Sequence, residues 1–113
     1  MSSHSGQRTS HDELRTGRQP ASIRRSVVEH VECTRGKNFD TANLWDRYTA
    51  MAYAMRDRLA RAWVRTSRRY YLHDAKRAYY LSAEYLLGRS LRNNLINMNL
   101  WTATDEALKE IGV

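Results

Sequence analysis

The segment TANLWDRYTAMAYAMRDRLARAWVRTSRR, residues 41–69, carries the strongest local signal in the sequence. Its apolar side chains recur at spacings of three and four residues, the period of one helical face. The stripe comprises Leu44, Tyr48, Met51, Met55, Leu59 and Ala62 or Trp63. Four arginines lie mostly off it: Arg47, Arg58, Arg61 and Arg65. A stripe of Met and aromatic residues can line a cofactor groove, but it more often packs in a core. The pattern therefore predicts one long amphipathic helix.

Shorter helices are predicted on both sides of this segment. Before it, Ser22 can cap a helix that ends near Gly36 and whose apolar positions recur every four residues. Those positions are Ile23, Val27 and Val31. After it, residues 90–98 and 102–111 read as two short helices, the second with Thr102 as its cap and Gly112 as its stop.

The run Ala78 to Leu81 is continuously apolar rather than alternating. This pattern is typical of a strand buried on both faces, so we expect one short β-strand at about 77–82 in an otherwise mostly α chain. A buried strand needs neighbours and covering layers, and the predicted helices leave apolar stripes uncovered. We therefore expect the sequence to be the front of a larger protein.

Composition limits the possible classes of protein. The 113 residues, 42% of them hydrophobic, suffice for one domain or part of one. Residues 1–20 are polar and charged, which predicts a disordered tail without a secretory h-region. No apolar run approaches the roughly 18 residues that span a bilayer. We expect no membrane association and a cytoplasmic location.

The single cysteine, Cys33, cannot form an internal disulfide. No second thiol or His pair sits around it at metal-ligand spacing, so we predict no metal site. A lone cysteine is usually a small, partly buried residue, and we expect this of Cys33.

The net charge of +7 permits two interpretations. A basic cluster, interleaved with Tyr70 and Tyr71, could contact phosphates and stack on bases, making the chain a small binding module for nucleic acid or another anionic partner. The cluster consists of Arg65, Arg68, Arg69, Lys76 and Arg77. The alternative is a solvated helix face. No RNA-binding or helix-turn-helix signature accompanies the charge, so we expect no nucleic acid partner.

Several motifs resemble the N-terminal region of glycogen, starch and maltodextrin phosphorylases, from about Ile23 to Val113. They are Arg56-Asp57, Trp63, Arg65-Thr66, Tyr70-Tyr71, Lys76-Arg77 and YYLSAEYLLGRSLRNNLIN, residues 79–97. The family pattern Y-[LI]-S-x-E-[FY]-x-x-G-R-x-L-x-N fits that last stretch. The Leu86-Leu87 pair is more similar to bacterial members.

This resemblance implies an allosteric, homodimeric glycosyltransferase of glycogen catabolism. Such enzymes cleave terminal α-1,4-glucosidic bonds with inorganic phosphate, release glucose 1-phosphate and use pyridoxal 5′-phosphate. The family fold has two doubly wound α/β domains of GT-B type, with the active site between them. Residues 21–113 would form the N-terminal portion of the first domain. The cofactor lysine and the catalytic groups lie downstream in the family, so we expect this chain alone to be inactive.

The resemblance also assigns roles near the predicted strand. Glu84 would lie just beyond the carboxyl end of the strand, facing the catalytic cleft. It would accept hydrogen bonds from a glycine-rich loop and so support the site. The alternative is that Glu84 merely pairs with Arg89 or Arg77. Leu86 would approach pyridoxal phosphate as an apolar wall.

Two further roles concern regulation and assembly. Tyr71 matches a tyrosine on which the nucleotide activator stacks in vertebrate members. The partner subunit's acidic and amide residues at that site correspond to Asn38 and Asp40 or their neighbours here, so the resemblance supports this effector site at Tyr71 alone. The segment 34–43 would cap the partner subunit of a dimer, which predicts Leu44 and Trp45 as interface residues.

Overall fold

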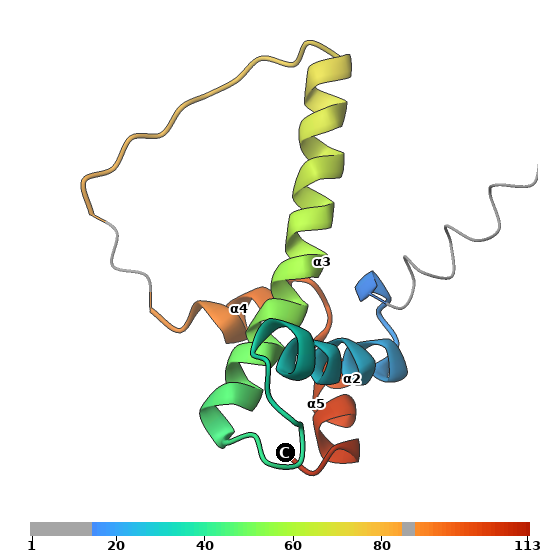
Figure 1. Cartoon of the computed structure of the whole chain (residues 1–113). Coiled ribbons are helices and arrows are strands. Elements are labelled where there is room, and N and C mark those ends of the chain that lie inside the picture. Colours follow the sequence, from blue (N-terminus) through green and yellow to red (C-terminus); the bar gives the residue numbers. More distant parts are fainter. Residues whose placement is uncertain (1–14, 85–87) are drawn as a thin grey trace, which may run out of the picture.

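The computed structural model describes residues 15–84 and 88–113. The first fourteen residues of the predicted tail lie outside this range, and so does Leu86. The described elements are the α-helices α2 (Pro20–Glu29), α3 (Leu44–Leu72), α4 (Ser90–Asn97) and α5 (Trp101–Glu110), with the π-helical turn η1 (His30–Thr34) after α2. α2 packs against both α3 and α5, while η1 contacts α3 and α4 contacts α5. Figure 1 shows these elements gathered around the first half of α3, whose second half stands away from them.

α2 and η1 together carry the predicted apolar row. Ile23, Val27 and Val31 are fully buried. The helix starts with Pro20, whose fixed φ suits the first turn, so Ser22 lies inside the helix rather than at its cap. The chain turns away at Gly36, where φ is +63°, as the predicted end required.

α3 is the long helix that the sequence predicts, but a different face of it is buried. Its buried residues are Asp46, Ala50, Ala54, Met55 and Arg58. Of the predicted stripe, Met55 is buried, whereas Leu44 is 75% exposed and Trp63 is 74% exposed. The small side chains of Ala50 and Ala54 allow close approach of a neighbouring helix, which bulky Tyr48 would prevent. The larger apolar residues are therefore left on the uncovered side.

The predicted strand at 77–82 is wrong for the structure as described. Residues 75–81 have no regular secondary structure, and Tyr80 and Leu81 are each 92% exposed. A strand exists only when its backbone groups pair with a neighbour. No segment within 15–84 or 88–113 offers such a neighbour, so the apolar run stays an extended, solvated connection (Figure 1).

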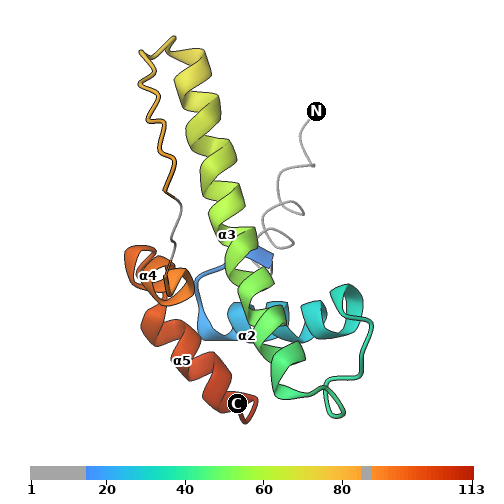
Figure 2. The ribbon, with the colours of Figure 1, turned by 90° about the vertical axis from the view of Figure 1, so that its left-hand side faces the viewer.

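α5 packs against α2, and α4 packs against α5; Figure 2 shows the two helices together at one side of α3. α4 starts at Ser90 as expected, but α5 starts at Trp101, so Thr102 is a helical residue and not the cap. Gly112, at φ +73°, follows the end of α5. The core consists of Ile23, Val27, Val31, Ala42, Ala50, Ala54, Met55, Leu95, Leu100 and Ala107.

Three further observations concern Cys33, possible metal ligands and possible membrane spans. Cys33 is exposed, which corrects the expectation that it is partly buried, because it lies on the outer side of η1. Within the described ranges no His, Cys, Asp and Glu side chains gather as a metal site. None of the described helices is both long and apolar enough to cross a bilayer.

Met55→Ala should destabilise the chain strongly. Met55 is fully buried, and the Thr104 hydroxyl of α5 donates to its sulfur at 3.9 Å. Truncating a buried Met to Ala removes apolar burial and leaves a cavity, at a cost of about 2–5 kcal/mol. Chemical denaturation followed by circular dichroism measures this cost. Met51→Ala, on the partly covered side of α3, is the control and should cost clearly less; equal costs would contradict the assigned core.

Candidate functional site

The segment that carries Glu84 is exposed in the described structure. The Ser82 hydroxyl accepts a hydrogen bond from the Glu84 N–H and lies 3.2 Å from the Glu84 carbonyl oxygen, to which it donates. Among the described residues, the Glu84 carboxylate forms no ion pair with Arg77 or Arg89. The pairing alternative is therefore absent here, while the role of Glu84 at an active site stays a prediction.

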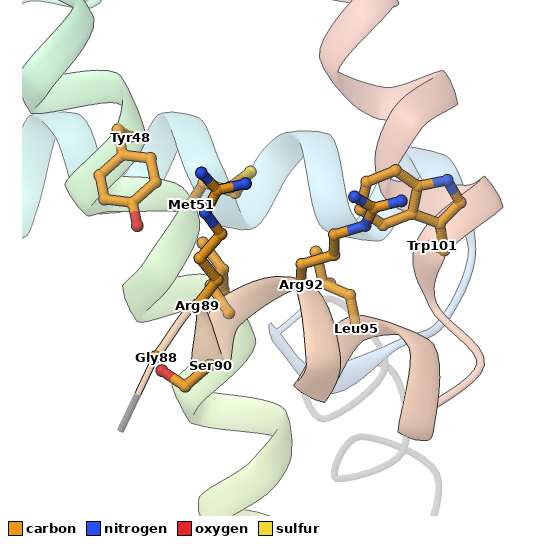
Figure 3. Close-up of a pocket in the computed structure, with 9 residues that line it drawn as sticks. Tyr48, Met51, Gly88, Arg89, Ser90, Arg92, Leu95 and Trp101 are labelled. Atoms are coloured by element: carbon orange, nitrogen blue, oxygen red, sulfur yellow. The ribbon is translucent and has the colours of Figure 1, made fainter. Parts of the chain in front are cut away.

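The end of the Glu84 motif lies against α3. Gly88, Arg89 and Ser90 line a hollow of about 360 Å³ together with Tyr48 and Met51 of α3. Figure 3 shows the Arg89 side chain extending toward Met51. On the other side of the same hollow, the Arg92 guanidinium lies 5.3 Å from the ring centre of Trp101 (Figure 3). The Gly-Arg pair is thus brought to the partly covered face of the long helix.

A second, more apolar hollow of about 770 Å³ opens at the start of α3. Its lining includes Leu44, Trp45 and Tyr48 from α3, with Leu108 and Val113 from the end of the chain. Trp45 stacks on Tyr48 at 5.9 Å between ring centres, and it stays largely exposed. Exposed apolar surface of this kind often marks a contact with another protein surface. The two residues predicted at a dimer interface therefore lie together and accessible.

Tyr71 and the basic cluster lie at the far end of α3. Tyr71 is exposed, as are all five members of the basic cluster. Lys76 and Arg77 line a hollow of about 500 Å³ with Trp63, Tyr70 and Tyr79, and Tyr71 is not part of its lining. The structure therefore brings two of the five basic residues beside aromatic rings, as the alternative binding-module interpretation would need, and leaves Tyr71 apart from them.

Sequence reasoning missed a buried acidic group at the start of α3. Asp46 is 1% exposed, and its carboxylate accepts hydrogen bonds from Arg35 Nη2 and Lys37 Nζ, both at 2.8 Å. The Asn43 side chain accepts from the Asp46 N–H at 2.8 Å, and Asp46 accepts from the Asn43 N–H in return. The signal for this was available, because Asn43 and Asp46 have the spacing of a capping box.

The same reasoning missed a second polar contact between η1 and α3. His30 Nε2 lies 2.8 Å from Asp57 Oδ2, which also accepts from Arg15 at 3.1 Å. The other ring nitrogen of His30 lies 2.7 Å from the Thr34 hydroxyl, and the ring stacks on Tyr53. Burial raises the pKa of Asp57, but the bonds from His30 and Arg15 outweigh it and lower the pKa overall. This cluster ties two elements together.

Known proteins place the chain in a family. It is 42% identical over 93 residues to the brain form of glycogen phosphorylase from Bos taurus, and 40% identical over the same length to the human brain form. It is also 40% identical over 91 residues to the muscle form from Ovis aries. These matches cover 80–82% of this chain and 11% of each relative. No family model matches the chain.

The sequence identity makes this chain a segment of a phosphorylase-type protein, and the structure shows that the segment is mostly helical. The chain belongs to the glycogen phosphorylase family over the matched residues, as the motifs at Arg56-Asp57 and 79–97 implied. Because it corresponds to 11% of the relatives' length, activity, substrates and partners do not follow from the match alone.

Asp46 should make the stability of the folded chain depend on pH. Hydrogen bonds from Lys37 and Arg35 lower the pKa of Asp46 from its ordinary value of 3.8 to about 2. A folded-state pKa below the unfolded value stabilises the fold above the unfolded pKa, and this contribution is lost as the pH falls toward the folded pKa. Asp46→Asn should therefore melt at a lower temperature than wild type at pH 6, and the difference should shrink between about pH 4 and pH 2.

The control for this prediction is Asp40→Asn, which neutralises an exposed carboxylate in the same loop. Thermal melts followed by circular dichroism at several pH values measure both variants. A difference between Asp46→Asn and wild type that stays constant down to pH 2 would show that the Arg35 and Lys37 contacts do not set this stability.

Proposed function

We propose that the chain supplies the N-terminal helical layer of an α-1,4-glucan phosphorylase. Such an enzyme releases glucose 1-phosphate from glycogen, starch or maltodextrin with inorganic phosphate. The observation that supports this most strongly is the 40–42% identity to glycogen phosphorylases across most of the chain. The fixed spacing of the motif at 79–97 agrees with it.

The arrangement of α3 fits this role. The second half of α3 and residues 77–81 expose apolar side chains that a covering layer would bury, including Trp63, Tyr80 and Leu81. In the proposed enzyme, residues 77–82 would pair with strands supplied by other parts of the protein, and the sheet would cover this side of α3. This pairing would bury the apolar run, which the described residues leave exposed.

The described residues do not by themselves form a site for pyridoxal 5′-phosphate, the cofactor that the resemblance implies. A Schiff base needs a lysine in a pocket beside groups that bind the phosphate. Lys37 is held by Asp46, Lys109 is held by Asp105, and Lys76 is exposed near the end of α3. Leu86, proposed as an apolar wall beside the cofactor, lies outside the described residues.

Glu84 would support the active site in the proposed enzyme by accepting backbone hydrogen bonds from a nearby loop. Its exposure leaves the carboxylate available for such donors. A carboxylate in direct contact with phosphate oxygens would be repelled, so a supporting role is favoured over one in the reaction itself. Inorganic phosphate and the glucan would then be bound by other residues of the enzyme.

The test is a chimera in which residues 21–113 replace the matched segment of the Bos taurus brain enzyme. The chimera should catalyse phosphorolysis of glycogen. Glu84→Gln in this chimera should lower kcat by about tenfold or more, because an amide accepts hydrogen bonds from backbone N–H groups less strongly than a carboxylate.

Glu106→Gln, an exposed position on α5, is the matched control and should leave kcat unchanged. A folded chimera without phosphorolysis would contradict the proposed function. Undiminished kcat in the Glu84→Gln chimera would contradict only the role of Glu84, and circular dichroism separates both results from misfolding.

Leu44 and Trp45 are proposed as residues of a homodimer interface. They border the apolar hollow at the start of α3, beside the segment 34–43 that would cap the partner. Trp45→Ala in the chimera should raise the dimer dissociation constant by about tenfold or more, because truncated interface aromatics commonly cost over 1.4 kcal/mol. Sedimentation velocity over a dilution series measures it. Trp101→Ala is the control, and equal dissociation constants for Trp45→Ala and wild type would contradict the assignment.

A further inference from the structure

Arg58 is a charged side chain buried in the middle of α3. The residue is 6% exposed, although its place in the sequence suggested a position off the buried face. Its Nε donates to the Gly17 carbonyl at 2.9 Å and its Nη1 donates to the Ala54 carbonyl at 2.7 Å. Its Nη2 is buried and has no hydrogen-bond partner within the described structure. The bonds of Nε and Nη1 therefore fix the guanidinium in place, while the N–H groups of Nη2 have no acceptor.

An unused cationic donor in this position is energetically unfavourable. Burial lowers the pKa of Arg58, an effect that the neighbouring Asp57 opposes. A guanidinium keeps its charge in proteins, so the group cannot escape the cost by losing a proton. The Asp57 carboxylate is engaged by His30 and Arg15 and makes no hydrogen bond to Arg58. An anion on Nη2 would remove this cost.

Arg58 lines a hollow whose other polar walls are mostly cationic. The hollow measures about 220 Å³ and includes Arg18, Arg61 and Arg65, with Met98 and Leu100 as apolar walls. Arg18 donates to the Met98 carbonyl, which holds its guanidinium at the rim. Among the described residues, no Asp or Glu lines the hollow. Its volume is below the roughly 300–1,000 Å³ of pockets for drug-sized ligands, and it suits a single small anion with a few waters.

We propose that this hollow binds a small tetrahedral oxyanion such as phosphate, with Arg58 Nη2 as the buried donor and Arg18 at the rim. The site lies where residues 16–18, α3 and the segment after α4 meet. This hollow is separate from the site proposed around Glu84, because it uses no residue of the motif at 79–97. Its occupation would link the segment before α2 to α3 through one charge.

Inorganic phosphate is the probe, titrated into the 113-residue chain against sodium chloride at matched ionic strength. Binding to the folded chain alone raises its melting temperature by mass action, so the wild-type midpoint should rise saturably with phosphate and not with chloride. Arg58→Met should abolish this rise. Arg56→Met, which removes the same charge from an exposed position two residues away, should retain it.

A second variant keeps the proposal testable if Arg58→Met fails to fold. Arg18→Gln leaves the bonds of Arg58 to Gly17 and Ala54 intact and should weaken the apparent phosphate affinity by about tenfold, the loss of one charge-assisted contact. The proposal is overturned if wild type shows no saturable phosphate effect. It is also overturned if Arg58→Met or Arg18→Gln responds to phosphate as Arg56→Met does.

Discussion

The structure depends on the buried carboxylate of Asp46. It accepts from Arg35 and Lys37 just after η1, and it closes a capping box with Asn43 at the first turn of α3. One side chain therefore starts the long helix and fixes the preceding loop to it. A buried carboxylate is stable only when its oxygens are paired, and here two cations and a backbone N–H do this. The direction in which α3 leaves the core is set at this point.

Beyond Asp46, the first half of α3 is held by a row of residues four positions apart. Ala50 and Ala54 allow α2 to approach, and Arg58 closes the row by bonding to Gly17. The cluster of His30 and Asp57 adds a second polar contact on the same half of the helix. Among the described residues, Trp63, Tyr71 and Leu72 of the second half are exposed. In the enzyme proposed above, other parts of the protein would cover this half of the helix.

The sequence predicted the long helix, the row Ile23, Val27 and Val31, and the family, because periodicity and fixed motif spacing are local properties. It did not predict which face of α3 is buried. Large apolar residues dominate a periodic stripe, yet the close contacts are made by alanines, whose importance appears only when two helices meet. The strand failed for a related reason, since pairing partners are not encoded in the run Ala78 to Leu81 itself.

The candidate sites were predictable to different degrees. Glu84 and Trp45 came from the resemblance, and their exposure is compatible with roles that other surfaces would complete. Arg58 could not be found from sequence, because a charged residue in an amphipathic helix normally points to solvent. The packing of residues 16–18 against α3 contributes to its burial. The capping box at Asn43 and Asp46 was visible in the sequence, but its two cationic partners required the loop to be placed.

The central claim, that the core described here anchors the first half of α3 more firmly than the second, is tested most directly by hydrogen exchange of the 113-residue chain. Backbone amides from Arg47 to Arg58 should be protected, because opening them breaks the core and the Asp46 contacts. Amides from Trp63 to Leu72 should exchange much faster, since the core does not cover that part of the helix. Uniform protection along the whole of α3, or faster exchange in its first half, would contradict this account.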